Sequence, residues 1–174
     1  MERIRTRNTG RGTSGSPEPV NRSSCAPPQE TSASSGSPTV LYVGPEPLYA
    51  HEGDSGADLA ASENCLIEAR SWALVKTGLK IAVPEGYEAQ VRPRSGMALK
   101  YGLTVLNTPG TVDSNYRGEV GVIVMNHNER AILIKRGERV AQLVIVPVAH
   151  ATFERVEELP DTDRGAGGFG STGV

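Results

Sequence analysis

From residue 40 onward, the chain consists of short apolar or alternating stretches that are separated by turn residues. The longest of them runs from Trp72 to Val83, alternates between apolar and polar residues, and stops at the turn that begins with Pro84. A period of two places every second side chain on one face of an extended chain, so this stretch predicts a strand with one buried face. Further stretches of this kind occupy residues 40–43, 87–92, 103–106, 120–125, 131–134 and 140–146.

Prolines punctuate these stretches in a way that suits strands. Pro84, Pro93, Pro109 and Pro147 fit strand ends and hairpins far better than they fit helices. Only residues 95–101 are compatible with a turn of helix. Many short strands at close spacing are typical of a sandwich, a barrel or a jelly roll. The expected fold class is therefore all-β.

Residues 1–39 differ in composition and are predicted to form a disordered N-terminal extension. Ile4 and Val20 are their only large aliphatic residues, so the segment cannot bury enough apolar area to offset the entropy of ordering it. Glu2 and the missing amphipathic pattern argue against a transit peptide, which leaves a cloning remnant or an overextended start site open. The extension carries a charge of +2 and the remainder −4. Because a mildly acidic body has no electrostatic footprint for nucleic acid, we expect no nucleic-acid partner.

The cysteines and the hydrophobic runs exclude several further classes of protein. Cys25 and Cys65 cannot form a disulfide framework, and no cluster of cysteine and histidine has the spacing of zinc ligands. No apolar run approaches the length of a membrane span, and no N-terminal segment resembles a signal peptide. We therefore expect a cytoplasmic protein without a membrane partner.

Three segments combine tight turns with polar groups. At the end of a predicted strand, Arg94 is followed by Ser95 and Gly96, whose backbone N–H groups could form an anion-binding concavity beside the guanidinium. A solvated strand end with an incidental arginine is the alternative. Asp58 stands between small residues, where it could contact a metal or water or cap a turn, and Gln142 is predicted to project from one face of a strand, where it needs a polar partner.

The hairpin around residues 107–119 carries the best candidate for a general base. Asp113 follows the apolar Val112 and is therefore expected on the opposite face, with Tyr116 three residues later. A positioned, ionised aspartate can take a proton from water, although its low reference pKa makes it a weak base. The alternative is that Asp113 only shapes its turn. The glycine-rich residues 161–173 are equally ambiguous, because a closing arm and a frayed terminus share that composition, and composition alone favours the frayed terminus.

Taken together, in this order and spacing, five segments resemble the signature motifs of the homotrimeric dUTPase family. They are residues 55–59 (SGADL), 93–98 (PRSGMA), 110–119 (GTVDSNYRGE), 137–143 (GERVAQL) and 164–173 (RGAGGFGSTG). The resemblance covers residues 40–174 and implies a jelly-roll (β-clip) domain at 40–159, a glycine-rich C-terminal arm at 160–174 that closes the active site, and a trimer with shared sites. The implied reaction is Mg²⁺-assisted hydrolysis of dUTP to dUMP and pyrophosphate by water attack on the α-phosphorus. It would limit uracil incorporation into DNA and supply dUMP for dTMP synthesis.

The resemblance also implies a role for individual residues. The catalytic residues would be Asp113, which holds and deprotonates the attacking water, together with Gln142 and Ser95 at the α-phosphate and its bridging oxygen. Asp58 would support Mg²⁺ through water, as suits an ion that loses its hydration shell reluctantly. Tyr116 would pack against the deoxyribose and exclude a 2′-hydroxyl by a clash. The other substrate-binding residues would be Arg94 and Gly96 at the phosphates, Asn107, Gly110, Thr111 and Val112 at the uracil, and Arg164, Phe169, Gly170, Ser171 and Thr172 in the arm.

Two rival functions use the same fold. A dCTP deaminase of this fold places a catalytic glutamate on the strand after the hairpin, but residues 120–125 contain no carboxylate. Zinc-dependent deamination is disfavoured because the paired-cysteine signature is missing. A nucleotide-gated regulatory protein stays open as a second role, although every proposed catalytic group is present.

Overall fold

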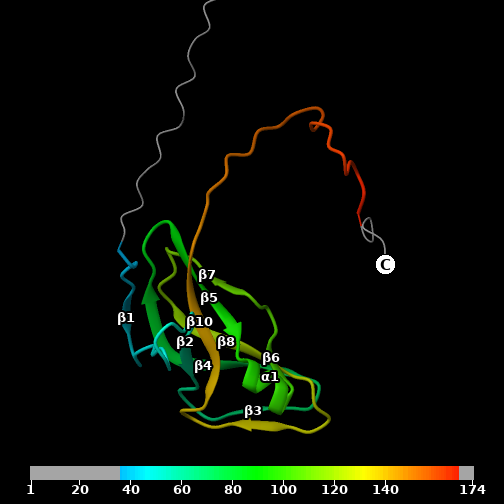
Figure 1. Cartoon of the computed structure of the whole chain (residues 1–174). Coiled ribbons are helices and arrows are strands. Elements are labelled where there is room, and N and C mark those ends of the chain that lie inside the picture. The colour runs from blue at the N-terminus through cyan, green and yellow to red at the C-terminus, as the bar shows by residue number, and fades with distance from the viewer. Residues whose placement is uncertain (1–35, 169–174) are drawn as a thin grey trace, which may run out of the picture. The chain divides into compact units, whose positions relative to one another are not determined.

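The computed structural model describes residues 36–168, and in this part of the chain it forms ten strands and one short helix (Figure 1). The strands make two four-stranded sheets and one two-stranded sheet, all with antiparallel pairing. The first sheet has the order β1 (Leu41–Val43), β4 (Trp72–Ala82), β8 (Glu119–Asn126), β6 (Leu103–Val105). The second has the order β2 (Ala57–Ala60), β10 (Arg139–Pro147), β5 (Tyr87–Pro93), β7 (Gly110–Val112). The third pairs β3 (Cys65–Ile67) with β9 (Ile132–Ile134), and α1 (Ser95–Tyr101) lies between β5 and β6.

The core is built from the alternation that the sequence displays. Along β4 the buried side chains are every second residue, among them Val75 and Leu79, and their neighbours face outward. The second sheet contributes Val91 and Leu143 to the same apolar cluster. Because both four-stranded sheets bury one face in this cluster, the other face of each sheet is available for polar side chains.

All seven stretches that the sequence predicts as strands are strands in the structure, and the all-β prediction is confirmed. The helix is also found at the predicted residues, and it ends at Gly102, whose φ of 57° is the left-handed conformation of a helix C-cap. β2, β3 and β7 were not predicted. β2 and β7 consist mostly of small or turn-forming residues, which show no apolar face in the sequence, and β3 has only three residues.

Several expectations concern parts of the chain that the structure describes incompletely. Residues 1–35 of the predicted extension lie outside the described residues, so the boundary at residues 39 and 40 stays a prediction. Residues 149–168, beyond β10, are exposed and contain no helix or strand. Within the described range, no helix is long and apolar enough to cross a membrane.

Candidate active site

A cleft of about 660 Å³ opens at one end of the second sheet. It is formed by the loop before β2, by β2 and β10, and by the end of β5 with the turn into α1. Its lining includes five residues that the sequence predicted for the site, four as contacts of the substrate and one, Asp58, as a contact of metal or water. These are Asp58, Arg94, Ser95, Gly96 and Gln142.

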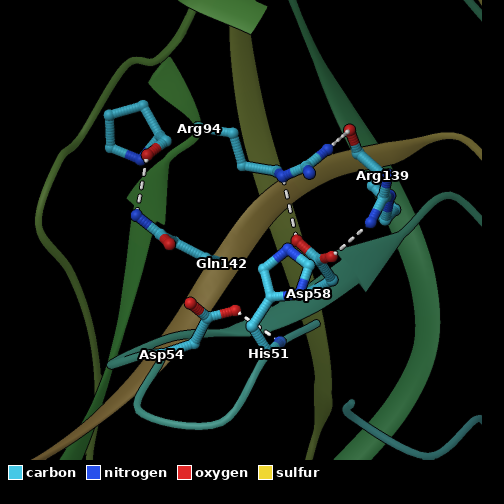
Figure 2. A network of polar contacts seen from close by, with 7 residues as sticks. His51, Asp54, Asp58, Arg94, Arg139 and Gln142 are labelled. Atoms are coloured by element: carbon cyan, nitrogen blue, oxygen red, sulfur yellow. Dashed lines mark hydrogen bonds and ion pairs between the residues drawn. The ribbon is translucent and has the colours of Figure 1, made fainter. Parts of the chain in front are cut away.

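A charged network holds the floor of this cleft. Asp58 Oδ1 lies 2.9 Å from Arg94 Nε, and Asp58 Oδ2 lies 2.9 Å from Arg139 Nη1. Figure 2 shows the carboxylate between the two guanidinium groups. Arg94 Nη1 also donates to the Arg139 carbonyl at 3.2 Å. The Asp58 side chain is only 17% exposed, so both arginines are fixed by a carboxylate that is largely removed from water.

Strand register explains why these side chains meet. Gln142 on β10 is opposite Asp58 on β2 and opposite Arg92 on β5, so the three side chains form one row across the open face of the sheet. Arg139 should face the other way, because it precedes Gln142 by three residues. A register shift between Arg139 and Ala141 adds one residue to β10, and both Val140 and Ala141 are buried. The bulge thereby turns Arg139 to the same face as Gln142.

The turn from β5 into α1 presents backbone donors to the cleft. Arg94 is still extended, with φ −92° and ψ 131°, and its carbonyl accepts from the N–H groups of Met97 and Ala98. The N–H groups of Ser95 and Gly96 precede these and belong to the first turn of the helix, where intrahelical partners do not exist. A Cβ added at Gly96 would meet nothing within 4 Å, so a ligand can approach this backbone closely.

Gln142 is held against the same turn. Its Nε2 donates to the Pro93 carbonyl at 3.2 Å, and a Cβ at Gly56 would lie 2.7 Å from its Oε1. Gly56 therefore leaves the space that the Gln142 amide occupies.

The charge of the cleft differs from that of the body. Arg92, Arg94 and Arg139 face two aspartates, Asp54 and Asp58, which gives the lining a net charge of +1 with His51 neutral. An acidic chain thus carries a locally basic cleft with a fork of arginines and free backbone N–H groups. Such a site suits an anion with several oxygens, such as a phosphate chain.

The second group of predicted residues lies on the hairpin between β7 and β8. Val112 is buried and Asp113 is exposed, as the alternation predicted. The Asp113 carbonyl accepts from the Tyr116 N–H at 3.1 Å, and Arg117 Nη1 donates to the carbonyls of Ser114 and Tyr116. Among the hydrogen bonds of residues 36–168, the turn is closed by these groups and not by the Asp113 carboxylate. The carboxylate is therefore left for other contacts.

The hairpin and the cleft are far apart within one chain. Val112 pairs with Ala89, so Asp113 comes level with Glu88 on β5, whereas Arg94 follows the opposite end of that strand. The six residues from Glu88 to Arg94 span roughly 20 Å at about 3.3 Å per residue. None of the hairpin residues is among those that line the cleft. The structure thus divides the predicted site into two parts.

Known proteins resemble the chain in sequence. The dUTPase family model matches residues 44–173. The chain is 56% identical to a deoxyuridine 5'-triphosphate nucleotidohydrolase of Picosynechococcus sp. over 128 residues, which is 74% of this chain and 90% of the relative. The chain belongs to the dUTPase family. A Clostridium tetani member with the same name is 51% identical over 127 residues, covering 73% of this chain and 88% of its own length.

Solved structures of dUTPases have the same fold. A variant of the dUTPase of Staphylococcus bacteriophage 80alpha with dUpNHpp superposes with a TM-score of 0.72 at 28% identity, covering 78% of this chain and 99% of that chain. A variant from phage phi11 of S. aureus, described with a structural Mg(II) ion, gives a TM-score of 0.65 at 25% identity and covers 71% and 99%.

Not every dUTPase-family site residue could be placed. Phe169, Gly170, Ser171 and Thr172 lie outside the described residues. Arg164 is exposed and its Nε donates to the Gly167 carbonyl at 2.8 Å, within a turn of its own segment.

Four charged or titratable residues that line the cleft were not singled out from the sequence: His51, Asp54, Arg92 and Arg139. A signal for Arg139 was present. The consecutive apolar pair Val140-Ala141 interrupts the alternation of its strand, and such an interruption is what a bulge leaves in a sequence. His51, Asp54 and Arg92 had no comparable signal.

Proposed function

We propose that the chain hydrolyses dUTP to dUMP and pyrophosphate, at sites that copies of a homotrimer share. One observation carries the shared-site part of this proposal. The phosphate-binding cleft and the Asp113 hairpin lie on the same chain but roughly 20 Å apart, so neither is a complete site.

The cleft would bind the triphosphate. Arg94 offers its guanidinium fork, and the N–H groups of Ser95 and Gly96 offer donors to oxygens of the α- and β-phosphates. Gln142 would contact the α-phosphate or the attacking water, since its amide is already fixed against the Pro93 carbonyl. Because Asp58 and Arg139 hold Arg94 before substrate arrives, little ordering is left for the moment of reaction.

The residues of the cleft fit magnesium only through water and substrate. No group of three or more potential metal-ligating side chains exists among residues 36–168. Asp58 uses one lone pair of each oxygen for an arginine, and the remaining acceptor sites can bind water molecules of a hydrated ion. Magnesium held by the phosphates would neutralise charge that develops on the leaving pyrophosphate. Asp58 would steady it through water.

The hairpin would supply the water-activating and sugar-reading groups. Asp113 is exposed, and its carboxylate would accept a proton from the water that attacks the α-phosphorus in line. Tyr116 would pack on the deoxyribose. Asn107 and the backbone of Gly110, Thr111 and Val112 would contact the uracil edge. Gly110 supports this arrangement, because a Cβ there would lie 3.1 Å from Asn107 Nδ2.

Two parts of one chain cannot perform this reaction together. Asp113 must reach the α-phosphorus through one water molecule, and Ser95 and Gln142 must contact oxygens of the same phosphate, so the groups must lie within about 6–7 Å of one another. A separation of roughly 20 Å along β5 exceeds that reach. The hairpin of one copy would therefore meet the cleft of a second. The arm, with Arg164, Phe169, Gly170, Ser171 and Thr172, would close over the completed site, and Arg164 would grip the γ-phosphate.

The deaminase alternative gains nothing from the structure. Glu119 is the carboxylate at the start of β8, and its Oε1 accepts from the Gly78 N–H at 2.7 Å. It is therefore engaged in the fold of the first sheet. A hydrolase acting on the free nucleotide pool, which we place in the cytoplasm, remains the function that the site supports best.

Mixing two inactive variants tests the reaction and the sharing of sites together. Asp113→Asn removes the water-activating carboxylate and Arg94→Gln weakens the cleft, so each pure trimer should release little pyrophosphate from dUTP with Mg²⁺. After subunit exchange at equal amounts, about a quarter of the sites should combine an intact hairpin with an intact cleft. Activity should recover to about that fraction of wild type.

The opposite result is equally clear. If each site lay within one chain, no mixture would contain an intact site and activity would stay at the level of the pure variants. The substrate panel of dUTP, dCTP, dTTP and UTP with wild-type protein is the control for the reaction itself. A folded wild type that does not turn over dUTP would overturn the proposed function.

A further inference from the structure

We propose that Gly118, Glu119 and a bulge in β4 form a support that fixes the Tyr116 ring and so sets the discrimination between deoxyribo- and ribonucleotides. This inference rests on the proposed function, in which Tyr116 packs on the sugar. In this proposal, Gly118, Glu119 and the residues of the bulge act on the substrate only through Tyr116, because they do not contact it themselves. They are positioning residues.

The Tyr116 ring is folded back over the backbone of its own hairpin. Its hydroxyl donates to the Glu119 carbonyl at 3.0 Å, three residues further along the chain. A Cβ built at Gly118 would lie 2.2 Å from Tyr116 Oη and 2.4 Å from Cζ. These distances are far below any van der Waals contact, so the ring can take this position only because residue 118 has no side chain.

Glu119 is in turn fixed by the first sheet. Lys76 pairs with Gly121 but Lys80 pairs with Glu119, so β4 carries two more residues than β8 between these pairs and bulges there. At the bulge, Gly78 has a φ of 71° and its N–H donates to Glu119 Oε1 at 2.7 Å. Glu119 thus connects the bulge, through its side chain, with the Tyr116 hydroxyl, through its carbonyl.

A second contact locks the bulge itself. Thr77 is buried, its Oγ1 donates to the Val120 carbonyl at 2.5 Å, and it accepts from the Leu79 N–H at 3.2 Å. On the outer side, the backbone of Gly44 approaches so closely that a Cβ there would lie 2.2 Å from the Gly78 carbonyl oxygen. The bulge is therefore held from both sides, and it forms a rigid base for Glu119.

A rigid ring is what discrimination by exclusion requires. A 2′-hydroxyl adds one oxygen to the sugar, and a pocket excludes it only if the side chain that clashes with this oxygen cannot move away. Tyr116 is 44% exposed, so packing against neighbouring side chains does not hold it on every side. The hydrogen bond from the Tyr116 hydroxyl to the Glu119 carbonyl restrains the ring, and the missing side chain at Gly118 lets the ring lie against the backbone.

The experiment measures kcat/KM for dUTP and for UTP in wild type and four variants of the full chain. Gly118→Ala displaces the ring directly, and Glu119→Ala removes the acceptor of the Gly78 N–H. Glu119→Gln is the matched control, because its amide oxygen accepts the same hydrogen bond. Tyr116→Ala removes the ring altogether and reports whether Tyr116 contributes to the preference for dUTP over UTP. Thermal unfolding of each variant accompanies the kinetics.

The expected sign separates a positioning role from loss of structure. Gly118→Ala and Glu119→Ala should lower the preference for dUTP by about tenfold or more and raise kcat/KM for UTP, while Glu119→Gln stays within about twofold of wild type. A hairpin that is merely loosened would lower kcat/KM for both nucleotides and leave their ratio unchanged, which would overturn the inference. If Tyr116→Ala loses the preference but the other variants keep it, the support is wrong and the proposed function stands. If wild type does not hydrolyse dUTP, both fail.

Discussion

Replacing Asp58 by Asn tests whether the ionic network of the cleft prepares it for phosphate. The carboxylate contacts Arg94 with one oxygen and Arg139 with the other, each at 2.9 Å. An asparagine of the same shape keeps one acceptor oxygen but turns an NH₂ group toward the second arginine. One arginine therefore loses its acceptor and faces a donor, so we expect the Arg94 guanidinium to lose its fixed orientation.

The structure sets the size of the expected effect. Side-chain exposures are 17% for Asp58, 28% for Arg94 and 54% for Arg139, so the pairs lie between buried and exposed. A hydrogen bond to a charged group contributes about 1.5–3 kcal/mol, and an exposed ion pair about 1 kcal/mol or less. We expect a loss of about 1–3 kcal/mol in the free energy of unfolding. If Arg94 fails to make one charge-assisted bond to substrate, kcat/KM for dUTP should fall about ten- to hundredfold.

The assay is a double-mutant cycle with kcat/KM for dUTP as its readout. Asp58→Asn, Arg139→Gln and the double variant are compared with wild type, since both single changes disturb the same network. The effect of the double variant should be clearly smaller than the sum of the single effects. Titration with Mg²⁺ in each variant separates the orienting role of Asp58 from its proposed contact with magnesium through water.

Two outcomes would refute this reasoning. If Asp58→Asn keeps kcat/KM within about twofold of wild type at saturating Mg²⁺, the network does not prepare Arg94 for substrate. If the single effects add fully, Asp58 and Arg139 act independently, and the contacts that join them carry no function.

Three further predictions follow from groups outside the cleft. Asn126 is fully buried, and its amide donates to the carbonyls of Ile67, Glu68 and Arg130. In urea titrations, Asn126→Ala should therefore lower the free energy of unfolding by about 2–4 kcal/mol, and a loss below about 0.5 kcal/mol would contradict this. Burial, and then the charge of Glu63, raises the pKa of the Cys65 thiol. Iodoacetamide should therefore label this thiol slowly at neutral pH, and labelling should speed up only when the pH exceeds the pKa of an ordinary thiol. Rapid labelling at neutral pH would contradict this prediction. The Arg70 guanidinium lowers the pKa of Glu129, so their contribution to stability is present above the unfolded-state pKa of the carboxyl and is lost as the pH falls through the lower, folded-state value. Because both groups are exposed, salt screens this contribution, so Glu129→Gln should lower the unfolding temperature only slightly in physiological salt, and a large drop would contradict this.

The parts of the fold that the sequence predicted share one physical property. Each of the predicted strands carries enough alternating or apolar residues to show which face is buried, as β4 does over eleven residues. β2 and β7 have four and three residues, and their sequences are dominated by small or turn-forming types. Such strands exist because longer neighbours, β10 and β5, offer them backbone partners. Pairing of this kind is a tertiary effect and leaves no pattern in the strand itself.

The candidate site was predictable to a different degree. The order and spacing of five motifs predicted a set of site residues, and the structure brings Asp58, Arg94, Ser95, Gly96 and Gln142 of that set together in one cleft. Asp58 was expected to support magnesium through water, and the structure adds that both its oxygens bind arginines. Arg139 faces the cleft because of a bulge in β10. Its contact with Asp58 could not be predicted from the sequence, because the two residues are separated by eighty-one positions.

The division of the site follows from sheet geometry and not from motif order. Motifs that are adjacent in the sequence, such as residues 93–98 and 110–119, suggest neighbours in space. β5 and β7 are indeed paired, but they are antiparallel, and the register places Val112 opposite Ala89. The chain after β7 therefore moves away from Arg94 at about 3.3 Å per residue, and Asp113 arrives at the far end of β5. Shifting β7 to bring Asp113 to the cleft would require about six residues of slippage, which would leave β7 without most of its partner strand. The fold thus holds the two groups apart within one chain, and the proposed function needs a second copy of the chain to bring them together. Complementation between Asp113 and Arg94 variants measures whether two copies share one site: recovered activity supports a shared site, and activity that stays at the level of the pure variants excludes it.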